Sequence, residues 1–86
     1  MKTASYTIHN EEGLHARPAT DFCETAMTFD CDIKLQKEGE DDIFEAKSII
    51  SILCMGAVKG ETIIITTDGA DEEAAIEALL KVLQNA

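Results

Sequence analysis

The sequence predicts an α+β protein with the element order strand, helix, strand, strand, helix, strand, helix (βαββαβα). Residues 2–8 and 32–36 alternate between apolar and polar side chains, as a half-buried strand does. After Pro18 the apolar residues recur at the i, i+3, i+4, i+7 spacing of a helix face. In this order, the helices that connect the strands lie on one face of a four-stranded sheet and leave the other face to solvent.

The first two elements follow from this periodicity and from one proline. Residues 2–8 form the first strand. The helix that follows opens around Pro18, because proline is tolerated in a first turn, where its missing N–H would have had no partner. It should end at about residue 27 or 28. Its predicted buried face consists of Ala19, Phe22, Cys23 and Ala26.

A hairpin is predicted next. Residues 32–36 form the second strand, and residues 43–46 return as the third, with Phe44 and Ala46 directed inward. The turn between them, residues 38–42, carries four carboxylates and no apolar anchor, which is typical of a solvated hairpin tip.

The C-terminal half contributes a helix, a strand and a helix. A short apolar helix runs from Ser48, its predicted N-cap, to about Cys54, and Gly56 ends it. The β-branched residues between 61 and 67 predict the fourth strand. Asp71 is the predicted N-cap of the last helix. The predicted buried face of that helix consists of Ile76, Leu79, Leu80 and Leu83.

Length and composition limit the function classes. Eighty-six residues, 45% of them apolar, are enough for one domain spanning residues 1–86 with one core. No apolar run approaches the roughly 20 residues of a membrane span, and no signal-peptide pattern is present, so we expect a cytoplasmic protein. A net charge of −10 argues against binding to nucleic acid or to anionic membrane surfaces.

The three cysteines and two histidines do not form a metal-binding pattern. Cys23, Cys31 and Cys54 are odd in number and lack a Cys-x-x-Cys spacing, and His9 and His15 do not complete a zinc ligand set. We therefore expect no metal site. Cys23 and Cys54 lie in apolar periodic stretches and are predicted to be small buried residues.

The segment Gly13-Leu14-His15-Ala16-Arg17-Pro18-Ala19 is the candidate functional site. The helix pattern places His15 at or just before a helix N-terminus, where the amides of Ala16 and Arg17 have no intrahelical partner. Free amides, the positive end of a helix and one guanidinium together form an anion site. A lone histidine is most often an ordinary surface residue, but a histidine within an anion site can become covalently phosphorylated.

This segment resembles the active-site signature of HPr, the histidine-containing phosphocarrier family of the bacterial sugar phosphotransferase system. Residues 47–50, followed by Met55-Gly56, resemble the regulatory-serine segment of the same family, and residues 67–72 with the helix after them also fit. The resemblance covers essentially the whole chain in order. It implies an open-faced β-sandwich with a mainly antiparallel sheet.

The resemblance also implies a function. Enzyme I would transfer a phosphoryl group to His15, and His15 would pass it to an enzyme IIA domain. Arg17 would stabilise the phosphoryl oxygens together with the amides of Ala16 and Arg17. Such a carrier is a stoichiometric substrate at each step and not an enzyme, and its transfer steps need no metal or organic cofactor. We expect it to be a monomer.

Ser48 has two interpretations. A serine at a helix start is usually only a cap, but in relatives from low-GC Gram-positive bacteria the matching serine is phosphorylated by an HPr kinase/phosphorylase. Ile50 and Ser51 stand here where methionine and glycine are more common, so recognition by such a kinase stays open. The alternative function is a Ser48-phosphorylated module that acts as corepressor with a catabolite-control repressor. The presence of His15 argues against a purely regulatory role.

Two features of the sequence concern partners. The apolar residues Ile49, Ile50, Ile52 and Leu53 exceed what one helix face buries, so we expect Ile49, Ile50 and Leu53 to contribute to a docking surface near His15. Between residues 11 and 32 there are six acidic residues and a single basic one, Arg17. Family members commonly carry lysines there, which meet an acidic surface of enzyme I. We therefore expect a matched, less acidic enzyme I.

Overall fold

The computed structural model describes residues 1–86 and contains the seven predicted elements in the predicted order. They are β1 (Lys2–Thr7), α1 (Ala16–Met27), β2 (Asp32–Lys37), β3 (Phe44–Glu45), α2 (Ile49–Met55), β4 (Thr62–Asp68) and α3 (Glu72–Gln84). No helix is both long and apolar enough to cross a membrane.

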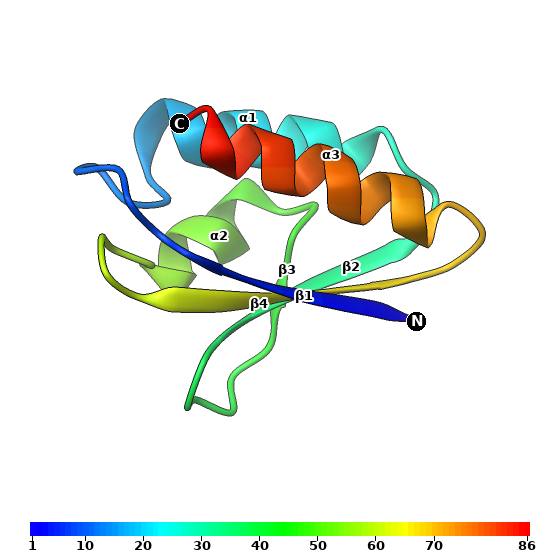
Figure 1. The fold of residues 1–86 in the computed structure, drawn as a ribbon, viewed down its shortest axis with the longest axis horizontal. Coiled ribbons are helices and arrows are strands. Elements are labelled where there is room, and N and C mark those ends of the chain that lie inside the picture. The colour runs from blue at the N-terminus through cyan, green and yellow to red at the C-terminus, as the bar shows by residue number, and fades with distance from the viewer.

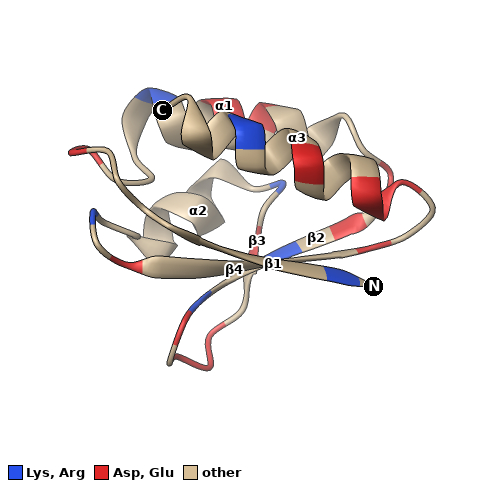
Figure 2. Ribbon diagram, in the orientation of Figure 1, with Lys and Arg blue, Asp and Glu red and all other residues tan.

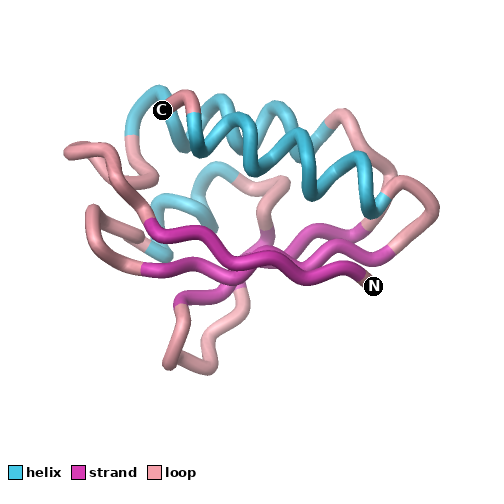
Figure 3. The backbone as a smooth tube through the Cα atoms, viewed as in Figure 1, coloured by secondary structure: helices cyan, strands magenta, loops and turns pink.

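The four strands form one sheet in the order β1-β4-β2-β3, and every neighbouring pair is antiparallel. All three helices lie on one face of this sheet (Figure 1). Figure 3 shows the opposite face without a covering helix, with only the β2–β3 hairpin projecting beyond it. The predicted α+β open-faced sandwich is therefore confirmed.

The core lies between the sheet and the helices. Along β4, Ile63, Ile65 and Thr67 are fully buried, while the residues between them are half-buried on the other face. Ile65 pairs with Ala4 of β1 on one side and with Leu35 of β2 on the other. The period-two pattern of the sequence is thus explained, because only one face of the sheet is covered.

Two predicted features of the short elements differ from the structure. β3 has only two residues, and Ala46 lies beyond its end, although its N–H still donates to the carbonyl oxygen of Ile33 at 3.1 Å. The prediction that Cys54 is buried is wrong, because Cys54 is exposed. Helix α2 buries Ile52 and Met55, which are three residues apart, and Cys54 lies on the side of the helix away from them.

The predicted N-cap of α3 lies at the right position but acts on a different segment. The Asp71 carboxylate makes no capping bond within α3. It accepts instead from the N–H groups of Asp30 and Cys31, at 2.9 and 3.0 Å, in the turn between α1 and β2. These hydrogen bonds lower the pKa of Asp71, and the bond from the Asp30 N–H has the largest effect. Asp71 therefore links two loops at one end of the molecule.

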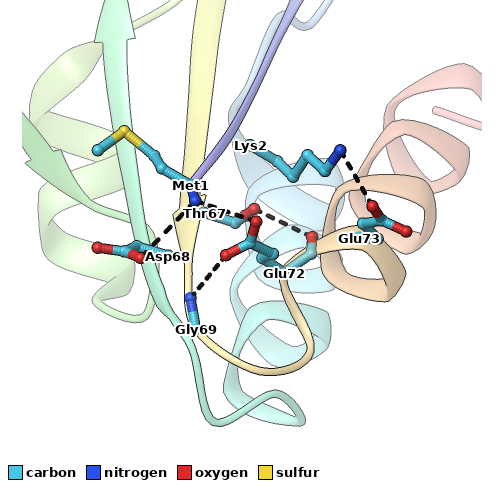
Figure 4. A network of polar contacts seen from close by, with 7 residues as sticks. All are labelled: Met1, Lys2, Thr67, Asp68, Gly69, Glu72 and Glu73. Carbon is cyan, nitrogen blue, oxygen red and sulfur yellow. Dashed lines mark hydrogen bonds and ion pairs between the residues drawn. The ribbon is translucent and has the colours of Figure 1, made fainter.

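The start of α3 is joined to the sheet by a polar network (Figure 4). Glu72 accepts from the N–H of Gly69 at 3.1 Å and lies 3.0 Å from the ammonium of Met1. Lys2 of β1 pairs with Glu73 at 3.0 Å. Glu72 and Glu73 thus form an acidic first turn of α3. Of the predicted buried face farther along, Leu79 and Leu83 are buried and Ile76 and Leu80 are half-buried.

Candidate functional site

The loop before His15 is held in place from two sides. Gly13 has a φ of +66°, and a Cβ atom there would lie 2.5 Å from the carbonyl oxygen of Ala57 and 2.8 Å from the Cα of Val58. The adjacent residue, Leu14, is buried, and its N–H donates to the same Ala57 oxygen at 2.9 Å. Only glycine fits this approach of two backbones.

Asn10 closes the other side of the loop. Its side-chain amide donates to the carbonyl oxygen of Gly13 at 2.9 Å, and the N–H of Gly13 donates to the carbonyl oxygen of Asn10 at 3.1 Å. Neither Asn10 nor Ala57 belongs to the candidate segment of residues 13–19. The turn-forming composition of residues 10–13 is a signal for Asn10, whereas nothing in the sequence indicates the contact with Ala57.

His15 is the N-cap residue of α1, so the prediction that it lies at a helix N-terminus is confirmed. Its backbone is extended, its side chain is exposed, and the imidazole makes no capping hydrogen bond. The helix begins at Ala16, two residues earlier than Pro18. Proline is compatible with this start, because the first-turn amides of a helix have no intrahelical acceptor.

Two amides at this helix end have no hydrogen-bond partners. Neither the N–H of Ala16 nor that of Arg17 has an acceptor within the protein. Ala16 is also the only non-glycine residue with a positive φ, at 52°, a conformation that costs roughly 1–2 kcal/mol for an L-residue. The structure thus keeps this irregular turn beside the exposed ring of His15.

Arg17 is exposed and makes no ion pair. It is unusual among the seven basic residues, four of which are lysines paired with glutamates. These are Lys2, Lys34, Lys37 and Lys59. Lys47 donates to the carbonyl oxygen of Phe29 at 2.7 Å. Only Arg17 and Lys81 have neither kind of partner, and of these two Arg17 lies in the first turn of α1, two residues after His15. Its guanidinium is available to an anion at the helix end.

Helix α2 presents apolar side chains beside α1. Ile50 and Leu53 are 71% and 41% exposed. Ile49 is half-buried and lines a groove of about 380 Å³ with Thr20 and Cys23 of α1. Ile49 thus lies against α1, the helix that begins after His15, while Ile50 and Leu53 are exposed on the same short helix α2.

Ser48 is the N-cap of α2, as predicted. Its hydroxyl accepts from the N–H of Ser51 at 3.3 Å, and the side chain is half-buried. Gly56 ends the helix in the left-handed conformation, and its N–H donates to the carbonyl oxygen of Ile52.

Other titratable groups lie outside this site. His9 is exposed, and its ring lies edge to face with the ring of Tyr6, with the two centroids 5.8 Å apart. Burial, and to a smaller extent a hydrogen bond to Asp71, raises the pKa of the Cys31 thiol to about 11. The thiol is therefore a weak nucleophile. No three His, Cys, Asp or Glu side chains come together in an arrangement that could hold a metal ion.

Comparisons with known proteins agree on one family. Residues 2–85 match the family model described as "PTS HPr component phosphorylation site". The phosphocarrier protein HPr of Haloferax volcanii is 42% identical over 77 residues, which cover 90% of this chain and 86% of that protein.

Solved structures show the same relationship. The structure of HPr-C-His from Thermoanaerobacter tengcongensis superposes with a TM-score of 0.92 at 38% identity, over 99% of this chain and 93% of that one. Crh, the catabolite repression HPr of Bacillus subtilis, has a TM-score of 0.71 at 29% identity, over 99% of both chains. The chain therefore belongs to the HPr family, the phosphocarrier proteins of the phosphotransferase system.

Proposed function

We propose that this protein accepts a phosphoryl group on His15 from phosphorylated enzyme I and passes it to an enzyme IIA domain. The observation that carries the proposal is the exposed imidazole at the start of α1, beside two partnerless amides and an unpaired guanidinium. In the first step a bond forms between an imidazole nitrogen of His15 and phosphorus, while the bond between phosphorus and enzyme I breaks. In the second step the same phosphorus–nitrogen bond breaks as the acceptor is phosphorylated.

The surroundings of His15 supply positioning and electrostatic stabilisation, which are the main contributions a protein makes to phosphoryl transfer. The amides of Ala16 and Arg17 are available as donors to the phosphoryl oxygens, and the Arg17 guanidinium compensates their charge. The protein is consumed and regenerated as a carrier, and it does not turn over a substrate alone. We expect it to act in the cytoplasm. It acts as a monomer, because enzyme I and the IIA domains must reach the same surface in turn.

The exposed apolar side chains of α2 are the second part of the proposal. Ile49, Ile50 and Leu53 lie on the helix that packs beside α1, so a partner aligned with His15 covers them. Apolar side chains exposed next to a reactive group are typical of a docking surface.

Incubation with phosphoenolpyruvate and enzyme I tests the proposal. We expect an acid-labile mass gain of one phosphoryl group, which His15→Ala abolishes. His9→Ala is the matched control, because His9 is also exposed but lies outside the site, and it should leave labelling intact. Labelling that survives His15→Ala would exclude His15 as the acceptor.

A regulatory role for Ser48 is the second candidate. The likeness to Crh, a catabolite repression HPr, favours it, and so does the position of Ser48 at the start of α2, next to Ile49. A phosphate there would add a charge of about −1.5 to −2 beside the docking surface. An HPr kinase/phosphorylase and a catabolite-control repressor are the partners that this alternative requires.

A further inference from the structure

A groove of about 480 Å³ lies beside the candidate phosphorylation site. It runs between α1 and the end of α3, which pack against each other. Its lining includes Glu12, Arg17, Asp21, Glu24, Val82 and Asn85. Figure 2 shows the same distribution along α1, with one basic position at the start of the helix and acidic positions after it.

The charge of this groove is not balanced within the protein. None of its three carboxylates, those of Glu12, Asp21 and Glu24, takes part in an ion pair or accepts a hydrogen bond from another side chain. Arg17 is the only basic residue in the lining, and it has no partner within 4 Å. The side chains of the lining therefore carry a net charge of −2, counted as one positive against three negative groups.

A protein that aligns with His15 and Arg17 approaches the rim of this groove, because Arg17 belongs both to the candidate phosphorylation site and to the groove lining. Covering unpaired carboxylates with an apolar or acidic surface removes them from water without compensation, which opposes association. Cationic side chains on the partner remove this cost and add long-range attraction.

We propose that the proteins that exchange phosphoryl groups with His15 present lysine or arginine side chains to the groove formed by Glu12, Asp21 and Glu24. This inference rests on the proposed function and specifies its partner. The attraction strengthens when His15 is phosphorylated, since the phosphoryl group adds negative charge at the same end of α1. The apolar surface of α2 then supplies contact area, and the groove supplies orientation and encounter rate.

The test uses enzyme I from the organism in which this protein occurs. The second-order rate constant for transfer from phosphorylated enzyme I to His15 is measured between ionic strengths of about 0.01 and 0.15 M, over which the Debye length falls from about 30 to about 8 Å. We expect the wild-type rate to fall by about tenfold. Asp21→Lys/Glu24→Lys should be slow at low salt and should lose this dependence.

Glu40→Lys/Asp42→Lys is the matched control. It makes the same change in net charge, from −10 to −6, at the hairpin tip between β2 and β3, which projects away from the helices. It should keep the steep salt dependence of the wild type. A wild-type rate that is flat or rises with salt, or a groove variant that behaves like the hairpin variant, would overturn the inference.

The extent of labelling separates the two proposals. Each variant is also incubated with excess enzyme I and phosphoenolpyruvate at 0.15 M salt until the reaction stops. If each chain gains one phosphoryl group but the transfer rate does not depend on groove charge, only the inference about the partner is contradicted. Absence of any phosphoryl group on His15 under these conditions contradicts the proposed function itself.

Discussion

Gly13→Ala should damage both stability and phosphoryl transfer, because the backbone of residue 13 is in contact with the loop at 57–58. The left-handed φ of +66° alone costs an L-residue roughly 1–2 kcal/mol. The new Cβ would also lie 2.5 Å from the carbonyl oxygen of Ala57 and 2.8 Å from the Cα of Val58, so one of the two backbones must move. Such overpacking typically costs about 1–3 kcal/mol.

The expected loss in the free energy of unfolding is therefore about 2–5 kcal/mol. An 86-residue domain has a total of about 4–13 kcal/mol, at roughly 0.05–0.15 kcal/mol per residue. The loss is measurable by urea denaturation followed by circular dichroism. In the fraction that stays folded, the shifted loop displaces His15 relative to the amides of Ala16 and Arg17, so we expect slower phosphorylation from enzyme I.

Gly39→Ala separates the two costs. Gly39 also has a left-handed φ, of +86°, but a Cβ there would have no neighbour within 4 Å, and the residue lies in the β2–β3 hairpin, which projects away from the helices. This variant should lose only roughly 1–2 kcal/mol and should be phosphorylated at the wild-type rate. Equal losses for Gly13→Ala and Gly39→Ala would show that the contact with Ala57 and Val58 does not determine the conformation of the loop.

Four further predictions concern charge. Arg17→Glu should slow the phosphorylation of His15 without lowering the urea midpoint, since it places a negative charge beside the phosphoryl group; an unchanged rate removes Arg17 from the mechanism. If Ser48 is a control point, Ser48→Asp should slow the same reaction through charge beside the docking surface, whereas a wild-type rate leaves Ser48 as a cap only. With an enzyme I whose docking surface is acidic, the rate of phosphoryl transfer to the wild-type protein should hold or rise between about 0.01 and 0.15 M salt, because screening weakens the repulsion between the two acidic surfaces. A steep fall would mean that the acidic residues around His15 do not affect the encounter. The pKa of Asp71 is lowered from 3.8 in the folded state, so its carboxylate stabilises the fold above that value and loses its contribution as the pH falls through the folded pKa. Between pH 6 and about 2 the urea midpoint should therefore fall less for Asp71→Asn than for the wild type. Parallel curves for the two proteins would contradict this role.

Local periodicity in the sequence is enough to locate several elements of this fold. Alternation along residues 2–8 and 32–36 marks strands because only one face of the sheet is covered, and the apolar spacing after Pro18 marks α1 because one side of that helix packs on the core. Pro18 and this spacing together placed His15 at the helix N-terminus. The order of the elements then limited the arrangement to helices on one face of a sheet.

Other features depend on contacts between segments far apart in the chain, and the sequence does not reveal them. Gly13 is required because residues 57–58 approach it, and no local pattern encodes that approach. Asp71 carries the sequence signal of an N-cap, yet its carboxylate binds the amides of Asp30 and Cys31, because the turn between α1 and β2 offers two donors at hydrogen-bonding distance.

The charge of the groove beside Arg17 is decided in the same way. The sequence shows an excess of acidic residues between 11 and 32, but it does not show which of them have cationic neighbours. Folding brings Lys59 to Glu11 and leaves Glu12, Asp21 and Glu24 in one groove without a lysine. Ion pairing between residues far apart in the chain depends on how the elements pack. Tertiary structure therefore fixes where the unbalanced charge of this protein meets its site.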